Sequence, residues 1–146
     1  MIEPSPEMMP VFASTKIKEH PDDYSIVSIS RKEEEKAREV LKNLEPWSSV
    51  TFDLEEISVV LREDAWEQIR NCFQVYQEEG PYRLLTFDIV LDLDLVGYLS
   101  VISSLLAKEG ISIYAVSTYL RDHILVKKKD AGKAADVIRK LIEPGR

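Results

Sequence analysis

Two spacings of apolar residues alternate along the chain. Segments with an apolar residue at every second position predict strands, and segments with apolar residues three or four positions apart predict helices. The first spacing predicts strands at 11–18, 24–30, 47–53, 56–62, 82–93, 111–118 and 123–128. The second spacing predicts helices at 31–45, 64–73, 96–108 and 130–143. The chain is therefore expected to be an α+β protein.

The order of these elements repeats once. Each half reads β-α-β-β-α, which is the ferredoxin-like split βαβ order without its last strand. We expect a flexible N-terminus at 1–10, a first unit at 11–79 and a second unit at 80–146. A sheet edge left unpaired would expose backbone donors and acceptors, so each unit needs a further strand. The segment 11–18 is predicted to cross over and complete the C-terminal sheet.

Several residues mark the ends of the predicted helices. Asp64 with Glu67 three positions later has the spacing of a capping box, and Asp130 is placed to cap the last helix. Gly110 follows the helix at 96–108 at the position where a left-handed residue commonly ends a helix.

The segment "LDLDLVGYLSVISSLLAKEGISIYAVSTYLRDHILV" resembles the ACT domain, a βαββαβ module that binds small effectors, mostly amino acids. The matching features are Gly97, which opens the helix, the join from Lys108 to Ile113, and the strand pair that follows. "PWSSVTFDLEEISVVLREDAW" and "ISIYAVSTYLRDHILVK" also resemble short tandem-ACT proteins related to cytosolic arginine sensors. The resemblance implies two ACT-type units packed together, with an effector bound at the seam between units.

An amino acid is a zwitterion, so its site must provide hydrogen-bond donors for a carboxylate and acceptors for an ammonium. The start of the helix after the loop Asp92–Gly97 offers free backbone N–H groups to a carboxylate. Asp94, Asp122 and the strand end at Ser117 and Thr118 can accept from the ammonium. The candidate ligand-binding residues are Asp92, Asp94, Leu95, Val96, Gly97, Tyr98, Tyr114, Val116, Ser117, Thr118, Tyr119 and Asp122.

Simpler roles for these residues stay open. Asp94 could cap the helix, Asp122 could be an ordinary turn residue, and Tyr114 and Tyr119 could serve packing alone. As a test, replacing Gly97 with leucine should fill the carboxylate space while the helix survives, because a helix tolerates leucine better than glycine.

Composition narrows the function. The net charge of −7 argues against nucleic acid as a partner, and the chain has no apolar run long enough for a membrane span. One cysteine among 146 residues excludes an internal disulfide and favours a cytoplasmic location. No catalytic triad, phosphate loop or metal-ligand spacing is found, so we expect no enzyme activity, no cofactor and no metal. His123 is interpreted as a hairpin residue, not a metal ligand.

These observations predict a regulatory amino-acid sensor, which forms a homodimer and has a possible protein partner. One alternative is an interaction or dimerisation module that has lost ligand binding. Another is a detached regulatory domain of an amino-acid biosynthetic enzyme. A likeness of fold raises the expectation of a ligand but does not name it.

Overall fold

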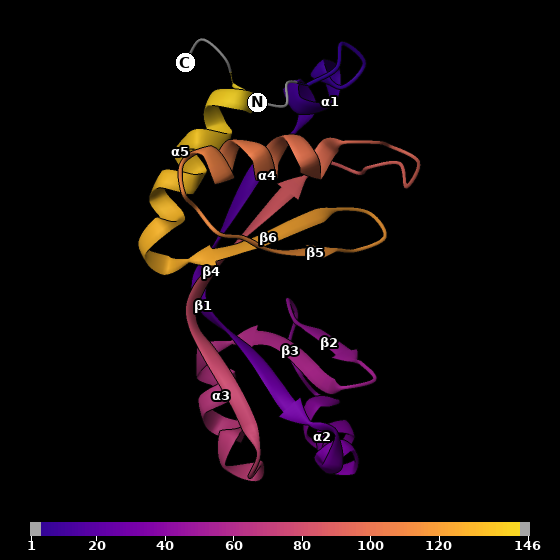
Figure 1. Ribbon diagram of the computed structural model, residues 1–146, viewed down its shortest axis with the longest axis vertical. Coiled ribbons are helices and arrows are strands. Elements are labelled where there is room, and N and C mark those ends of the chain that lie inside the picture. Colours follow the sequence, from indigo (N-terminus) through magenta and orange to yellow (C-terminus); the bar gives the residue numbers. More distant parts are fainter. Residues whose placement is uncertain (1–3, 144–146) are drawn as a thin grey trace. The chain divides into compact units, whose positions relative to one another are not determined.

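The computed structural model describes residues 4–143 and divides the chain into two compact units. Unit 1 comprises Met1–Pro21 with Arg83–Arg146, and unit 2 comprises Asp22–Tyr82. The two long strands β1 (Lys16–Ser30) and β4 (Tyr76–Asp88) each contribute to both units (Figure 1).

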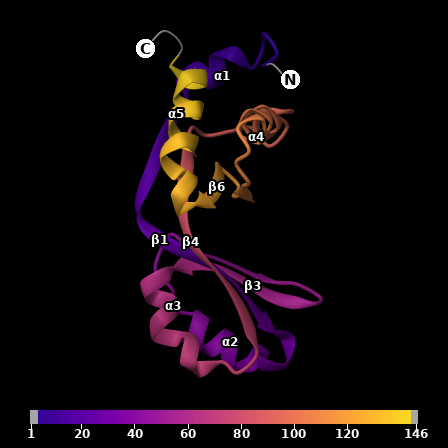
Figure 2. The same ribbon diagram turned by 60° about the vertical axis from the view of Figure 1, so that its left-hand side comes forward.

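Unit 2 is a complete βαββαβ unit. After β1 come a short 3-10 turn (Arg31–Glu33), α2 (Glu34–Leu41), β2 (Ser49–Phe52), β3 (Glu56–Arg62), α3 (Glu63–Ile69), a 3-10 turn (Arg70–Cys72) and the first part of β4. The strand order is β2-β3-β1-β4, with Val27 opposite Val59 in the antiparallel β1–β3 pair. The helices α2 and α3 cover one face of these strands (Figure 2). Alternate apolar residues of β1 and β3 pack there against Ala37, Leu41 and Trp66.

Unit 1 has the same architecture, but its last strand comes from the N-terminus. It contains α1 (Met9–Ser14), the first residues of β1, the end of β4, α4 (Tyr98–Lys108), β5 (Tyr114–Ser117), β6 (Asp122–Lys127), a 3-10 turn (Lys128–Asp130) and α5 (Ala131–Ile142). The strand order is β1-β4-β6-β5. The N-terminal strand therefore completes the C-terminal sheet, as the missing fourth strand predicted.

The two central strands of unit 1, β4 and β6, are buried on both faces. Leu85 and Phe87 of β4 pack with α1, α4 and α5 in one apolar core, together with Ile124 and Val126 of β6. The residues that alternate with them are Leu84, Thr86, His123 and Leu125, and all four are also buried. Two polar side chains thus lie in an apolar setting, which requires hydrogen-bond partners for both.

The N-terminal segment differs from the sequence prediction in two ways. Residues 11–14 belong to the helix α1 and not to a strand, because Met8 and Phe12 lie one turn apart and both are buried against unit 1. The expected flexible stretch 1–10 therefore includes an ordered, buried residue, while residues 1–3 lie outside the described part of the chain. The sequence "EHPDD" between the predicted strands 11–18 and 24–30 is typical of a turn, but no turn forms there, because β1 runs straight through Pro21. Pro21 belongs to unit 1, where β1 is an edge strand and a missing N–H is tolerated.

The predicted boundary between the units and two predicted helix caps also differ from the structure. The predicted division at residues 79 and 80 falls inside β4, since Gly80 and Pro81 are strand residues. Asp64 is the second residue of α3 and accepts from its neighbour Ala65 N–H at 2.8 Å, so it forms no capping box. Asp130 occupies the position before α5, but its side chain makes no capping hydrogen bond within the described residues.

The end of α4 follows the sequence prediction. Gly110 has a φ of 73°, in the left-handed region. Its N–H donates to the carbonyl of Ala107 at 3.0 Å, and the N–H of Ile111 donates to the carbonyl of Leu106 at 2.9 Å. This pair of bonds is the Schellman arrangement, which ends the helix and turns Ile111 back into the core.

Candidate functional site

An open cavity of about 360 Å³ lies in unit 1 between the start of α4 and the β5–β6 hairpin. This volume falls within the range of roughly 300–1,000 Å³ that is usual for small-molecule sites. One wall is the β4–α4 loop with the first turn of α4, and the other is the hairpin end. The lining residues are Leu91, Asp92, Leu93, Leu95, Gly97, Tyr98, Leu99, Ser100, Ser117, Thr118, Tyr119, Leu120, Arg121 and Asp122.

The first turn of α4 faces this cavity with unsatisfied donors. Gly97 precedes the helix, and no side chain among the described residues caps it. The N–H groups of Tyr98, Leu99 and Ser100 have no partner within the helix, because the first intrahelical bond runs from Val101 N–H to the carbonyl of Gly97 at 3.2 Å. All three residues line the cavity. Oriented N–H groups and the helix dipole favour an anionic group such as a carboxylate at this wall.

The opposite wall is held by hydrogen bonds of the hairpin. The turn closes when the backbone N–H and the hydroxyl of Thr118 both donate to the carbonyl of Arg121, at 2.9 and 3.0 Å. Ser117 Oγ donates to Asp122 Oδ1 at 2.7 Å, directly across the strand pair. These bonds fix an array of oxygen acceptors at the strand ends.

The charges at the cavity are one guanidinium and two carboxylates. Arg121 also reaches Asp88 Oδ1 through its Nε at 3.1 Å, so its charge is partly neutralised. Asp92 Oδ1 accepts from the N–H of Asp94 at 3.0 Å, which stabilises the loop as an Asx turn. Asp122 and Asp92 leave a net negative charge at the cavity, which suits a ligand that carries an ammonium group.

The rest of the lining is apolar. Four leucines of the loop and the first turn of α4 face the cavity, together with Tyr98, Tyr119 and Leu120. Tyr119 is 76% exposed and Leu93 is 66% exposed, so apolar surface continues out to the rim. A ligand with an apolar side chain would remove this surface from water, and that burial is favourable.

The structure brings eight of the twelve candidate residues to this cavity: Asp92, Leu95, Gly97, Tyr98, Ser117, Thr118, Tyr119 and Asp122. Tyr114 and Val116 do not line it. They pair with Leu125 and His123, while Ser117 pairs with Asp122, so strand alternation turns Tyr114 and Val116 to the sheet face opposite α4. Asp94 and Val96 belong to the loop but are exposed and face away from the cavity.

Six lining residues were not among the candidates: Leu91, Leu93, Leu99, Ser100, Leu120 and Arg121. Leu91 immediately precedes the loop, and its N–H donates to the carbonyl of Leu120 at 2.9 Å, which ties the loop to the hairpin. Ser100 is the third residue of α4, two positions beyond the candidate residue Tyr98. The signal for Ser100 was available, because a helix start offers its first three N–H groups together.

The capping role left open for Asp94 and the proposed Gly97→Leu test are both corrected by the structure. Asp94 does not cap α4, since Gly97 occupies the capping position. Gly97 has a φ of 92°, a conformation that strains any L-residue, and a side chain there would point toward Met8. A leucine at position 97 would therefore strain the backbone and press on the core. It is not a clean test of the carboxylate space.

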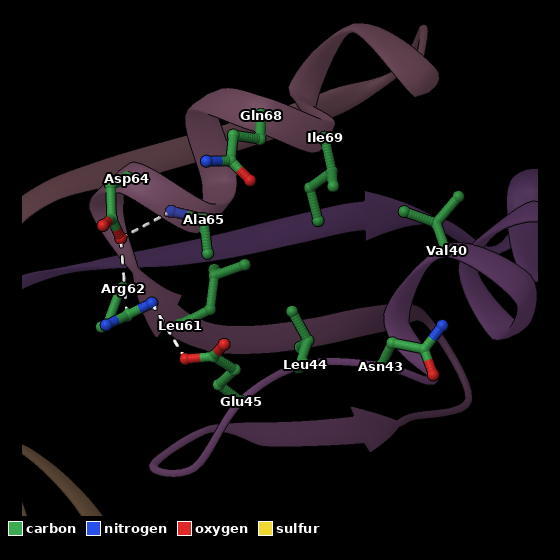
Figure 3. A pocket seen from close by; sticks show the side chains of 10 residues that line it. All are labelled: Val40, Asn43, Leu44, Glu45, Leu61, Arg62, Asp64, Ala65, Gln68 and Ile69. Carbon is green, nitrogen blue, oxygen red and sulfur yellow. Dashed lines mark hydrogen bonds and ion pairs between the residues drawn. The ribbon is translucent and has the colours of Figure 1, made fainter.

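A second, smaller cavity of about 230 Å³ lies in unit 2. Figure 3 shows its apolar floor, which includes Leu44, Leu61 and Ile69, and the ionic groups at its edge. There Arg62 pairs with Glu45 at 3.2 Å and with Asp64 at 3.5 Å. The guanidinium is thus engaged by two carboxylates. The cavity lies beside α3, which has seven residues, and offers no helix start comparable to that of α4.

The described residues contain no group of three or more His, Cys, Asp or Glu side chains placed to hold a metal ion. None of the helices between residues 4 and 143 combines the length and the apolar character that crossing a membrane requires.

Unit 2 thus has the βαββαβ order of a ferredoxin-like, ACT-type unit, and unit 1 has the same architecture with its last strand supplied by the N-terminal strand. Residues 78–140, most of unit 1, match the family model of the ACT domain. A protein from Vibrio cholerae described as of unknown function and possibly a transport protein is similar in fold, with 21% identity and a TM-score of 0.70 over 90% of this chain and 93% of that one. A protein from Agrobacterium tumefaciens is 24% identical, with a TM-score of 0.65 over 88% of this chain and 89% of that one.

A third similar structure is described as a regulatory subunit of an enzyme. The regulatory subunit of aspartate kinase from Thermus thermophilus is 11% identical, with a TM-score of 0.64 over 89% of this chain and 98% of that one. No curated protein sequence matches the chain. None of the three structures is described as an arginine sensor, so that part of the sequence resemblance stays a prediction.

Proposed function

We propose that this protein is a regulatory, non-catalytic module that binds an amino acid with an apolar side chain in the unit 1 cavity. The observation that supports this proposal most strongly is the start of α4, which no side chain among the described residues caps and whose first three residues line a cavity that also contains carboxylates and leucines. Each part of an apolar amino acid then has a partner of suitable chemistry.

The ligand is oriented by these partners. Its carboxylate accepts from the N–H groups of residues 98–100, and Arg121 adds positive charge at the same cavity. Its ammonium donates toward Asp122 and the hydroxyl oxygen of Thr118. Its side chain lies against the leucines of the loop. A cationic side chain fits less well, because Asp94 does not line the cavity and the rest of the lining is mostly apolar.

One ligand is expected per chain. In unit 1 the connection from β4 to α4 spans residues 89–97 and forms a wall of the cavity. In unit 2 the corresponding connection is only the 3-10 turn Arg31–Glu33, and Glu33 there accepts from the N–H groups of Gln74 and Val75. The second unit therefore lacks the long loop that the proposed site uses.

The first test is a thermal-shift screen with each of the standard amino acids. At 100 times its dissociation constant, a ligand stabilises the folded state by about 2.7 kcal/mol. We expect the largest shifts from leucine, isoleucine, valine and phenylalanine. A flat response to every amino acid would favour the alternative of an interaction module without a ligand.

A matched pair of variants locates the site. Asp122→Asn keeps the size and an acceptor for Ser117 but removes the charge, so we expect its dissociation constant for L-leucine to rise roughly tenfold, as for the loss of one charge-assisted bond. Asp94→Asn also removes one negative charge nearby, but from a residue that does not line the cavity. The affinity of this variant for L-leucine should stay unchanged. Equal effects of both variants in equilibrium dialysis would contradict the assigned site.

The way in which binding is read out is also a proposal. A ligand shifts a protein only through different affinities for two states, and here one state would favour a second copy of the chain or another protein. The edge strand β5 of unit 1 and β2 of unit 2 are available for pairing, so we expect a homodimer. Sedimentation as a monomer at tens of micromolar, with and without L-leucine, would count against it.

A second candidate is a regulatory subunit of an amino-acid biosynthetic enzyme. The observation that favours it is the similarity in fold and length to the aspartate kinase regulatory subunit from Thermus thermophilus. The proposed ligand site is the same in both cases, and only the partner differs.

A further inference from the structure

A hydrogen-bonded chain of four side chains crosses unit 1 and ends at the cavity. His20 Nε2 lies 2.8 Å from Thr86 Oγ1, which lies 2.9 Å from His123 Nδ1. His123 Nε2 then lies 3.2 Å from Thr118 Oγ1, a residue that lines the cavity. Thr86 and His123 are 7% and 5% exposed, so the middle of the chain is buried. These side chains come from β1, β4, β6 and the hairpin turn, all within unit 1.

The direction of every bond in this chain follows from its last member. The single hydroxyl hydrogen of Thr118 donates to the carbonyl of Arg121 at 3.0 Å, so Thr118 Oγ1 must accept from His123 Nε2–H. A neutral imidazole with its hydrogen on Nε2 has a bare Nδ1, which accepts from the hydroxyl of Thr86. The oxygen of Thr86 in turn accepts from His20 Nε2–H.

This arrangement decides what Thr118 can offer to a ligand. Its hydrogen is used by Arg121, and one oxygen lone pair is used by His123. The remaining lone pair is an acceptor only, so the Thr118 hydroxyl can receive a hydrogen bond from an ammonium but cannot donate to a carboxylate. The orientation of the ligand is thus fixed at this wall.

We infer that His123 is a positioning residue of the ligand site, which holds Thr118 as an acceptor for the ligand's ammonium and makes ligand affinity fall when the His123 ring is protonated. This inference rests on the proposed function. A charge on the His123 ring, next to Thr118, would repel the ammonium that Thr118 accepts from.

The surroundings of His123 keep the ring neutral near neutral pH. Burial lowers the pKa of His123 below its usual 6.5, and the charges of His20 and Arg121 lower the pKa further, while Asp122 raises it. Arg121 is itself paired with Asp88 of β4. Protonation of His123 at Nδ1 would also reverse its bond with Thr86, whose hydroxyl oxygen would then accept from the ring.

The hydrogen-bond direction can be tested without any ligand. Long-range ¹H–¹⁵N correlation spectra of the full chain should show the neutral Nε2–H form of His123 near neutral pH. Observation of the Nδ1–H form, or of a charged ring at that pH, would overturn the inference directly.

The effect on binding is tested with L-leucine as the probe. The dissociation constant should be constant just above neutral pH, where the ligand still carries its ammonium, and should rise by up to about tenfold per pH unit once His123 begins to be protonated. His123→Gln supplies an amide N–H near the position of Nε2 but does not titrate. It should keep the affinity within about threefold near neutral pH and lose this part of the acid dependence. His123→Leu should weaken binding roughly tenfold at every pH, because it removes the donor to Thr118.

His20→Gln is the second control, since this residue lies outside the cavity. It removes the charge that lowers the pKa of His123, so the acid-induced rise in the dissociation constant should begin at a higher pH. Identical pH profiles for the unaltered chain and His123→Gln would overturn the linkage even if L-leucine binds. If no amino acid binds at any pH, the proposed function fails together with the linkage, while the spectra still decide the state of His123.

Discussion

Replacing Phe12 with alanine should lower the free energy of unfolding by about 3–5 kcal/mol, the usual cost of emptying a buried phenylalanine site. Phe12 is 1% exposed and its ring stacks on Tyr98 with the ring centres 4.8 Å apart. Tyr98 begins α4 and lines the cavity. A residue near the N-terminus therefore supports the ligand site from far away in sequence.

Met9→Ala is the matched control, because Met9 belongs to the same helix but is 46% exposed. We expect it to change stability by less than about 0.5 kcal/mol, as exposed substitutions generally do. Urea unfolding followed by circular dichroism gives both values, and hydrogen exchange of the β6 amides assigns the loss to unit 1. A Phe12→Ala chain as stable as Met9→Ala would show that the N-terminal segment does not pack on unit 1.

The sequence was informative where local and tertiary preferences agree. The Gly110 helix end was predictable because a glycine at this position satisfies the last carbonyls of α4 whatever surrounds it. The need for an N-terminal strand in the C-terminal sheet was predictable because an incomplete βαββαβ unit leaves an unpaired edge. Both arguments use rules that do not depend on side-chain detail.

The prediction from sequence was wrong where one sequence pattern is compatible with two local structures. The stretch 11–18 has residues that suit a strand, but Phe12 gains more by packing as part of a helical turn against Tyr98. Pro21 is typical of a turn, yet it lies within β1, which is an edge strand of unit 1. An edge strand accepts a proline without losing a hydrogen bond to a neighbouring strand. In both cases the deciding contact is long-range, and a single sequence does not show it.

The candidate site was predicted as a region more reliably than residue by residue. The loop and the hairpin meet because consecutive elements of a split βαβ unit place them at one end of α4. The prediction did not consider on which face of the sheet each side chain of β5 lies. Strict alternation separates Ser117 from Tyr114 and Val116 once the face covered by the helices is known. The chain from His20 to Thr118 joins four elements, so no spacing in the sequence could indicate it.

The last prediction concerns alkaline pH. Burial raises the pKa of Tyr98 to about 12, the hydrogen bond with Thr15 offsets part of this rise, and the nearby charge of Asp122 adds to it. The hydroxyl of Thr15 donates to the carbonyl of Val11 at 2.7 Å, so Tyr98 must donate its own hydrogen to Thr15 at 2.9 Å. The fold therefore uses Tyr98 in its neutral form.

The sign of the resulting pH dependence follows from proton binding. The ordinary tyrosine pKa of 10.0 applies to the unfolded chain, so between pH 10 and about 12 the unfolded state releases a proton that the folded state retains. The contribution of Tyr98 to stability is complete below the unfolded pKa and is lost as the pH rises through this window. A shift of two pKa units corresponds to about 3 kcal/mol.

Tyr98→Phe separates this contribution from that of other groups, including Tyr24 of unit 2, whose pKa is also raised by burial. The variant should lose about 1 kcal/mol near neutral pH, since it lacks the hydrogen bond to Thr15. Its free energy of unfolding should then fall less steeply than that of the unaltered chain between pH 10 and 12. Tyr119→Phe, at a residue 76% exposed, should leave the slope unchanged. Parallel urea-unfolding curves for the unaltered chain and Tyr98→Phe across this window would show that Tyr98 is not held neutral by the fold.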